Sequence, residues 1–185
     1  MEKSKNLEFT LHTEETAPEE SAKTFGQIKE QFGFIPNVLR QMAESPTAIQ
    51  TDLQMLGMYG KSSLTTEEQW IVLLITSSNC YASYCVAANS TVAQMLGVTN
   101  DIVEAIRTGK PLTNPKLEAL RLFTTEMVDK RGAVTPQTRN NFYGAGYTKQ
   151  QALDVILGIS VETMASYTAH IAETPLDPEF QKNSI

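Results

Sequence analysis

The segment from residue 65 to residue 98 constrains the fold most, because it predicts two consecutive helices joined by a short polar junction. The two threonines at 65–66 can cap the first helix, and glutamates follow in its first turn, where negative charge suits the helix dipole. The run 70–75 is apolar on nearly every side, so this helix should be buried inside the domain. The second helix is expected over 83–96, and Gly97 ends it in the usual way.

The rest of the sequence repeats the helical period. Apolar residues recur at three- and four-residue steps in segments that prolines open and glycines close. The fold class is therefore predicted to be all-α, with a single compact multi-helix domain over 19–180 and a tail over 181–185. Residues 1–18 form an N-terminal arm in which Leu7, Phe9 and Leu11 alternate with polar residues. This arm is interpreted either as a frayed terminus or as an extended segment that docks on a neighbour.

Two glycines fall inside predicted helices, Gly26 in the first and Gly158 in the last. A glycine in a helix interior costs about 1 kcal/mol relative to alanine. We therefore expect another helix to approach closely at each of the two positions.

Composition excludes several classes of function. A formal net charge of −6 with only 15 Lys and Arg residues argues against nucleic-acid binding, which requires a basic surface. No apolar run approaches the roughly 18 residues of a membrane span, and no signal-peptide core follows Met1, so we expect a cytoplasmic protein without a membrane partner. The two histidines, His12 and His170, are too few for a multi-histidine metal site, and no phosphate-binding loop occurs. We expect neither a metal nor a cofactor.

The two cysteines, Cys80 and Cys85, are too few for a secreted disulfide framework, so they are either inert or redox-active. Cys85 falls in the first turn of the second predicted helix, where unpaired N–H groups favour the thiolate and lower the thiol pKa. The alternative is that Cys85 is a small buried hydrophobic residue, because Val86 and two alanines follow it.

The segment EQWIVLLITSSNCYASYCVAANSTVAQMLGV resembles the core of the alkylhydroperoxidase D-like, or carboxymuconolactone decarboxylase, family. Peroxidase members of that family carry the motif Cys-x-Tyr-Cys-x-Ala-Ala-His. The resemblance extends to 33–37 and 45–46 on one side and to 167–170 and 174–177 on the other, so it covers roughly residues 25 to 180. It implies an all-α domain of the alkylhydroperoxidase D-like type that forms a homodimer, trimer or hexamer, with its site near the subunit contacts.

The motif transfers to this sequence only in part. Cys85 takes the place of the second motif cysteine, which attacks the peroxide in the peroxidases. The first motif cysteine falls on Ala82, the histidine on Asn89, and the relay glutamate on Trp70. In an alternative register Glu68 precedes Cys80 by the family's glutamate-to-cysteine distance of twelve residues. Residues 80 and 85 could then form a disulfide only if the junction between them is not helical.

The resemblance and these residues support three hypotheses of function. The first is a peroxiredoxin-type antioxidant enzyme in which Cys85 reduces a hydroperoxide, Glu68 is the base, and Cys80, a partner chain or a small thiol resolves the product. The second is an oligomeric scaffold or small-molecule-binding protein with a pocket beside Trp70, Tyr84 and Asn89. The third and weakest is a lactone decarboxylase.

The closing segment of the resemblance includes His170. This residue is therefore a candidate for substrate binding. Its position near a helix C-terminus, where a positive charge is favoured, gives a structural role instead.

Overall fold

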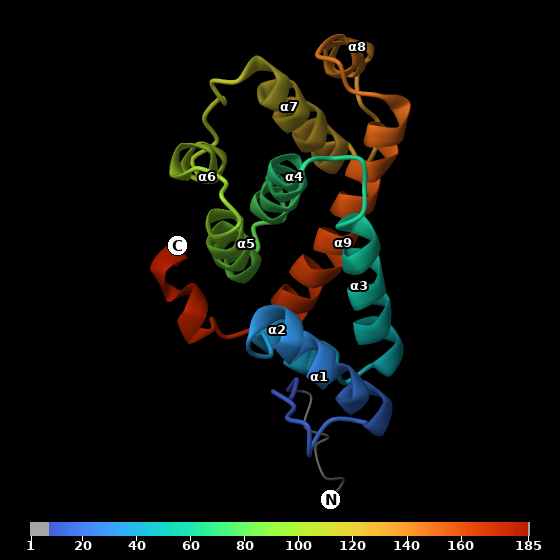
Figure 1. Cartoon of the computed structure of the whole chain (residues 1–185), viewed down its shortest axis with the longest axis vertical. Helices are drawn as coiled ribbons and strands as arrows, with labels where there is room; N and C mark the ends of the chain where they lie inside the picture. The colour runs from blue at the N-terminus through green and yellow to red at the C-terminus, as the bar shows by residue number, and fades with distance from the viewer. Residues whose placement is uncertain (1–7, 185) are drawn as a thin grey trace, which may run out of the picture.

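A computed structural model describes residues 8–184, and within them every regular element is helical, which confirms the all-α prediction (Figure 1). The elements are α1 (Glu19–Phe32), α2 (Asn37–Met42), α3 (Pro46–Tyr59), α4 (Thr66–Asn79), α5 (Ser83–Met95), α6 (Asn100–Arg107), α7 (Pro115–Asp129), α8 (Pro136–Gly144), α9 (Lys149–Ile171) and the 3₁₀ helix η1 (Pro178–Asn183).

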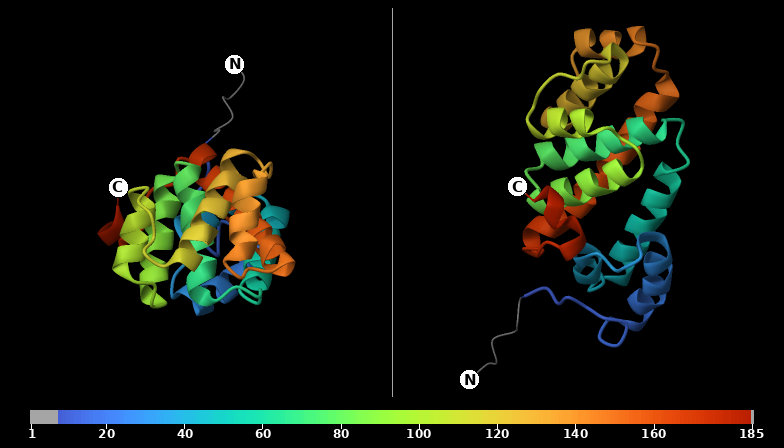
Figure 2. Two further views of the ribbon diagram at one scale, coloured as in Figure 1. Left: turned by 90° about the horizontal axis from the view of Figure 1, so that it is seen from above. Right: turned by 60° about the vertical axis from the view of Figure 1, so that its left-hand side comes forward.

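Helix α4 lies at the centre of the molecule. It packs against α5, α6, α7 and α9, and every side chain from Ile71 to Ser77 is buried. The sequence prediction of an inner helix is therefore confirmed. Helix α9 crosses the molecule behind α4 and continues along α3 to the end that holds α1 and α2 (Figure 1). Figure 2 shows that α8 and the arm before α1 lie at opposite ends of the molecule.

A sharp, non-helical junction connects α4 to α5. Cys80 is the C-cap of α4, and Tyr81 has a left-handed backbone with φ of 56°. The amide of Ala82 then donates to the carbonyl of Ser77 at 3.0 Å, which turns the chain back on itself. This junction holds the start of α5 against the C-terminal end of α4 and places residue 85 in the interior of the domain.

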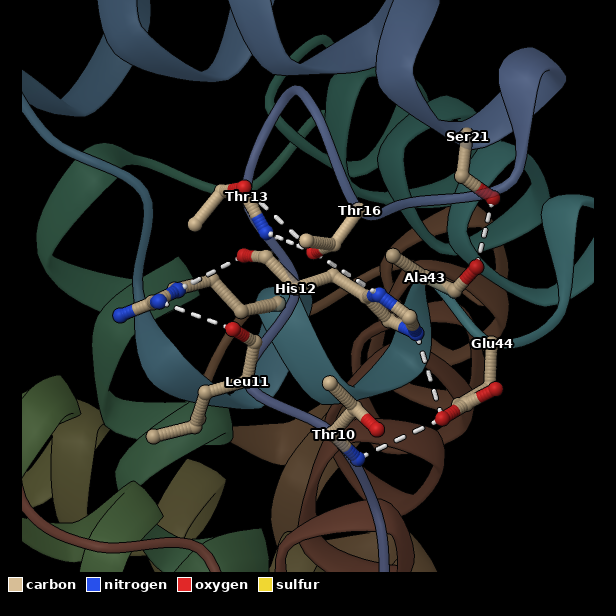
Figure 3. Close-up of polar contacts among 9 residues, drawn as sticks. Thr10, Leu11, His12, Thr13, Thr16, Ser21, Ala43 and Glu44 are labelled. Atoms are coloured by element: carbon tan, nitrogen blue, oxygen red, sulfur yellow. Dashed lines mark hydrogen bonds and ion pairs between the residues drawn. The ribbon is translucent and has the colours of Figure 1, made fainter.

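The described part of the arm, residues 8–18, lies on α2 of its own chain. The Arg40 guanidinium donates to the carbonyls of Leu11 and His12, each at 2.9 Å, and the His12 ring lies 3.2 Å from the Glu44 carboxylate (Figure 3). The amide of Thr10 also donates to Glu44, at 3.3 Å. The arm is therefore anchored within the subunit. The predicted alternation begins at residue 7, which lies outside the described residues.

Gly158 of α9 lies directly under the buried ring of Tyr59 of α3. A Cβ atom on Gly158 would be 2.6 Å from Cζ of that ring. The prediction of a close helix approach is therefore confirmed at Gly158. It is wrong at Gly26, where a Cβ atom would meet nothing within 4 Å.

Candidate functional site

A cavity of about 100 Å³ lies between α3, α4, α5 and α9, and Phe180 of the C-terminal segment also lines it. Its wall is mostly apolar, with contributions from Leu39, Leu56, Trp70, Leu73, Val161 and Phe180. Five polar or reactive side chains also line it, namely Asp52, Tyr84, Cys85, Asn89 and Glu162. The cavity therefore brings together a thiol, an amide and two carboxyl groups in apolar surroundings.

The thiol of Cys85 is in the first turn of α5 and is 4% exposed. Burial raises the pKa of this thiol well above its usual value, and the Glu162 carboxyl beside it raises the pKa further. Ser166 has an opposing effect. The sequence-based expectation of a lowered thiol pKa is therefore wrong, because burial outweighs the stabilisation of the thiolate by the helix N-terminus.

Glu162, from the middle of α9, is the carboxyl group next to the thiol. Burial raises its pKa to about 8, although hydrogen bonds with Asn89 and Ser166 oppose the shift. The Ser166 hydroxyl donates to Oε1 at 3.1 Å, and the Cys85 side chain acts to lower the pKa of this carboxyl group. A carboxyl whose pKa lies near neutrality can both accept and return a proton.

Asp52, from α3, is the second carboxyl group of the cavity. It is 4% exposed, and burial raises its pKa to about 7. Its Oδ1 atom is buried and has no hydrogen-bond partner. Its charge also acts on both Glu162 and Cys85.

Sequence reasoning missed both carboxyl groups. One signal was present, because Glu162 is the only charged residue in the stretch of sequence between Val155 and Ala169. A charged residue on an apolar helix face is rarely buried without a function or a partner.

Trp70, Tyr84 and Asn89, which the sequence proposed as a substrate pocket, all line the same cavity as Cys85. The Tyr84 hydroxyl donates to Oδ2 of Asp177 at 2.5 Å, which ties the C-terminal segment to α5. The Asn89 amide donates to the Ser77 hydroxyl at 3.3 Å. These contacts fix two polar side chains at the cavity wall.

Cys80 and His170 lie outside this cavity. Cys80 faces a different groove, beside Ile156 and Tyr167, and both cysteines are free. The His170 ring hydrogen-bonds through Nε2 to the Cys80 carbonyl oxygen at 2.8 Å. The structure therefore places His170 at the α4–α5 junction, where its observed contact is with the backbone.

Glu68 does not line the cavity either, because it serves the N-terminus of α4. Its carboxylate accepts from the Thr65 amide at 2.9 Å, and the Thr65 hydroxyl accepts from the Glu68 amide at 3.2 Å, which together form a capping box. Nζ of Lys116 lies 2.9 Å from its other oxygen. Burial acts to raise the Glu68 pKa, but the Thr65, Lys116 and Tyr147 contacts together lower it. The structure thus separates Glu68 from the thiol it was expected to serve.

Replacing Glu68 by alanine should lower the free energy of unfolding by about 1–2 kcal/mol, because the cap and the ion pair are both lost. Glu68→Gln should cost less, since glutamine preserves the capping box. Neither change should alter chemistry at Cys85. Urea denaturation of both variants measures the two costs, and equal costs would show that the cap contributes nothing.

Among residues 8–184 no group of His, Cys, Asp and Glu side chains is arranged to hold a metal ion. No helix in the same part of the chain has the length and apolar character to cross a membrane.

Comparison with known proteins identifies the fold. No protein-family model and no curated protein matches the sequence, but several solved structures match along nearly the whole chain. The alkylhydroperoxidase AhpD core structure of an uncharacterized peroxidase-related protein from Ralstonia eutropha JMP134 superposes with a TM-score of 0.83, at 16% identity and 93% coverage of both chains. An uncharacterized peroxidase-related protein from Silicibacter sp. TM1040 gives 0.79, at 20% identity and 97% coverage of both chains.

A third similar structure is a cysteine-to-alanine variant of the debrominase Bmp8 in complex with 2,3,4-tribromopyrrole. It gives a TM-score of 0.81 at 17% identity, and the match covers 97% of this chain and 96% of that one. The resemblance noted in the sequence is confirmed at the level of architecture: this chain has the alkylhydroperoxidase AhpD-like fold.

Proposed function

We propose that this protein reduces small hydroperoxides through Cys85. The observation that carries the proposal is that the Cys85 thiol and the Glu162 carboxyl line the same mostly apolar cavity, where the carboxyl raises the pKa of the thiol. A buried thiol with a raised pKa reacts slowly unless a base takes its proton. Glu162 lies at the wall of the same cavity, and its ionised form, whose population grows as the pH approaches 8, is suited to this role.

The reaction uses these two groups, a proton for the leaving oxygen and one external reductant. Glu162 takes the thiol proton while the sulfur attacks the terminal peroxide oxygen. An S–O bond forms, the O–O bond breaks and the leaving oxygen takes up a proton, which gives an alcohol and a sulfenic acid. A small thiol then condenses with the sulfenic acid to a mixed disulfide and water, and a second thiol releases Cys85. We assign this step to an external thiol because Cys80 faces a different groove.

The size and lining of the cavity indicate the substrate class. A volume of about 100 Å³ holds only a few non-hydrogen atoms, and no basic residue lines the wall to pair with an anion. Small uncharged alkyl hydroperoxides fit these conditions better than hydroperoxides of fatty acids, which carry a long chain and a carboxylate.

The test is peroxide consumption by the purified protein with ethyl hydroperoxide and excess small thiol. Cys85→Ser should reduce turnover to the rate without protein, because the nucleophile is lost. Cys80→Ser, the matched control, should retain turnover. Dimedone labelling followed by mass spectrometry should locate a sulfenic acid on Cys85. Unchanged turnover in Cys85→Ser would refute the proposed function.

A second candidate is the binding of a small aromatic ligand without thiol chemistry. Trp70, Tyr84 and Phe180 line the cavity, and a protein of similar fold binds 2,3,4-tribromopyrrole. In that case a halogenated pyrrole should raise the melting temperature of the wild type and of Cys85→Ser equally, without peroxide turnover in either. No shift in melting temperature would count against this candidate.

A further inference from the structure

Asp52 takes no part in the reaction described above, although the position of its carboxyl group is energetically unfavourable. Its carboxyl is buried, and its Oδ1 atom has no hydrogen-bond partner. Leaving a buried polar atom unpaired typically costs about 1–3 kcal/mol. Such a cost is tolerated mainly where the group meets a ligand or takes part in a reaction.

The residues around Asp52 determine the charge of its carboxyl group. Asp52 lines the same cavity as Cys85 and Glu162, but it comes from α3, whereas Glu162 comes from α9. Among residues 8–184 no lysine, arginine or histidine lines the cavity, so no cation from this part of the chain holds the Asp52 carboxyl in its charged form. Burial raises its pKa to about 7, so a large fraction of the group is protonated at neutral pH.

The proposed reduction needs a proton donor that Glu162 alone does not supply. When the O–O bond breaks, the leaving oxygen departs as an alkoxide, which is a strong base that needs a proton in this mostly apolar cavity. At that moment Glu162 is taking up the thiol proton. A second, protonated carboxyl group in the same cavity would complete the transfer.

We propose that Asp52 is a catalytic residue that donates a proton to the leaving oxygen of the hydroperoxide. This inference rests on the proposed function. The thiol proton goes to Glu162, the Asp52 proton goes to the alkoxide to give the alcohol, and the sulfur is oxidised to the sulfenic acid. The proton on Glu162 then restores Asp52, so the two carboxyl groups hold the same number of protons before and after the step. Their mutual electrostatic effect makes it unfavourable for both to be ionised, so the pair shares a proton, and the step starts from the form in which Asp52 carries that proton and Glu162 is ionised.

The experiment compares two oxidants that differ in their leaving group. Ethyl hydroperoxide releases ethoxide, which needs a proton, whereas peracetic acid releases acetate, which does not. Asp52→Asn should lower kcat/KM for ethyl hydroperoxide by about a hundredfold, a typical contribution of general acid catalysis. The same variant should lower kcat/KM for peracetic acid much less. Glu162→Gln should slow both oxidants, because the thiol must lose its proton in either case.

Two controls keep the test independent of folding. Asp101→Asn, which removes an exposed carboxyl group, should change neither rate. In the wild type, the preference for peracetic acid over ethyl hydroperoxide should be smaller than the preference shown by free cysteine, because Asp52 assists only the alkyl substrate. Equal losses with both oxidants in Asp52→Asn, no loss with either, or a wild-type preference equal to that of free cysteine would overturn the role of Asp52. Loss of both activities in Cys85→Ser would still uphold the proposed function.

Discussion

Replacing Glu162 by glutamine is expected to make the protein more stable than the wild type at pH 8 and to flatten its stability between pH 5 and pH 8. The pKa of Glu162 rises from an ordinary value of 4.5 to about 8 in the folded protein, chiefly because the side chain is buried. Between these values the folded state holds a proton that the unfolded state has lost. The free energy of unfolding therefore falls as pH rises, by roughly 1 kcal/mol per pH unit.

The sign distinguishes Glu162 from an ordinary ion-paired carboxylate. The favourable contribution of the neutral carboxyl is complete below the unfolded pKa and is lost as pH rises through the folded pKa. Asp52 acts in the same direction, since burial raises its pKa from 3.8 to about 7. Glutamine has nearly the same shape as a protonated glutamic acid but cannot ionise, so the variant avoids the loss that the wild type suffers.

Urea denaturation of the wild type and of Glu162→Gln at pH 5, 6, 7 and 8 measures this effect. The difference between the two proteins should widen toward pH 8 and reach a few kcal/mol. Glu104→Gln, which changes an exposed glutamate of α6, should follow the wild type at every pH. Parallel curves for the wild type and Glu162→Gln would show that Glu162 is not held neutral by burial.

Local sequence patterns sufficed to predict the helices and the inner position of α4. The apolar residues on all sides of 70–75, the capping threonines and the turn residues act within a few positions along the chain, and the structure bears them out. Gly158 also allowed a tertiary contact to be predicted. A glycine inside a helix lowers stability, so a close approach by another helix was expected to compensate. At Gly26 the same reasoning failed, because that position faces no neighbour.

The candidate site depended on contacts that no local pattern contains. The pKa of Cys85 is set by burial and by Glu162 of α9, which overcome the local effect of the α5 N-terminus. Asp52 lies on the same buried face of α3 as Ile49, three residues earlier. The helical spacing of residues in the sequence does not by itself distinguish a buried acid from an exposed one. At the end of α3 the interior position is taken by Tyr59, and the neighbouring Met58 is 61% exposed.

The position of the carboxyl groups explains how a cavity with acid–base capacity exists despite the altered motif. The resemblance assigns a relay glutamate to the position of Trp70, and Trp70 indeed lines the cavity. The indole of Trp70 cannot replace a carboxyl group as a proton relay, but the Glu162 carboxyl, from α9, lines the same cavity. The alternative assignment of that role to Glu68 followed a spacing along the chain, whereas the carboxyl group beside the thiol comes from a helix more than 70 positions later in the sequence.

Replacing Gly158 by alanine is expected to destabilise the protein by about 2 kcal/mol, although alanine is the better helix former by about 1 kcal/mol. The new Cβ would be 2.6 Å from Cζ and 2.7 Å from the hydroxyl oxygen of Tyr59. This ring is 1% exposed, and its hydroxyl donates to the Gln69 carbonyl at 3.0 Å, so moving the ring strains the packing and breaks a buried hydrogen bond.

The matched control is the same substitution at Gly26, which also lies inside a helix but has no atom within 4 Å of the new Cβ. At Gly26 only the difference in helix propensity between glycine and alanine acts, so Gly26→Ala should stabilise the protein by up to about 1 kcal/mol. Thermal and urea denaturation of both variants should therefore give changes of opposite sign. If Gly158→Ala were as stabilising as Gly26→Ala, α3 and α9 would have to separate readily. The cavity that Asp52 of α3 and Glu162 of α9 share would then not be held at a fixed width.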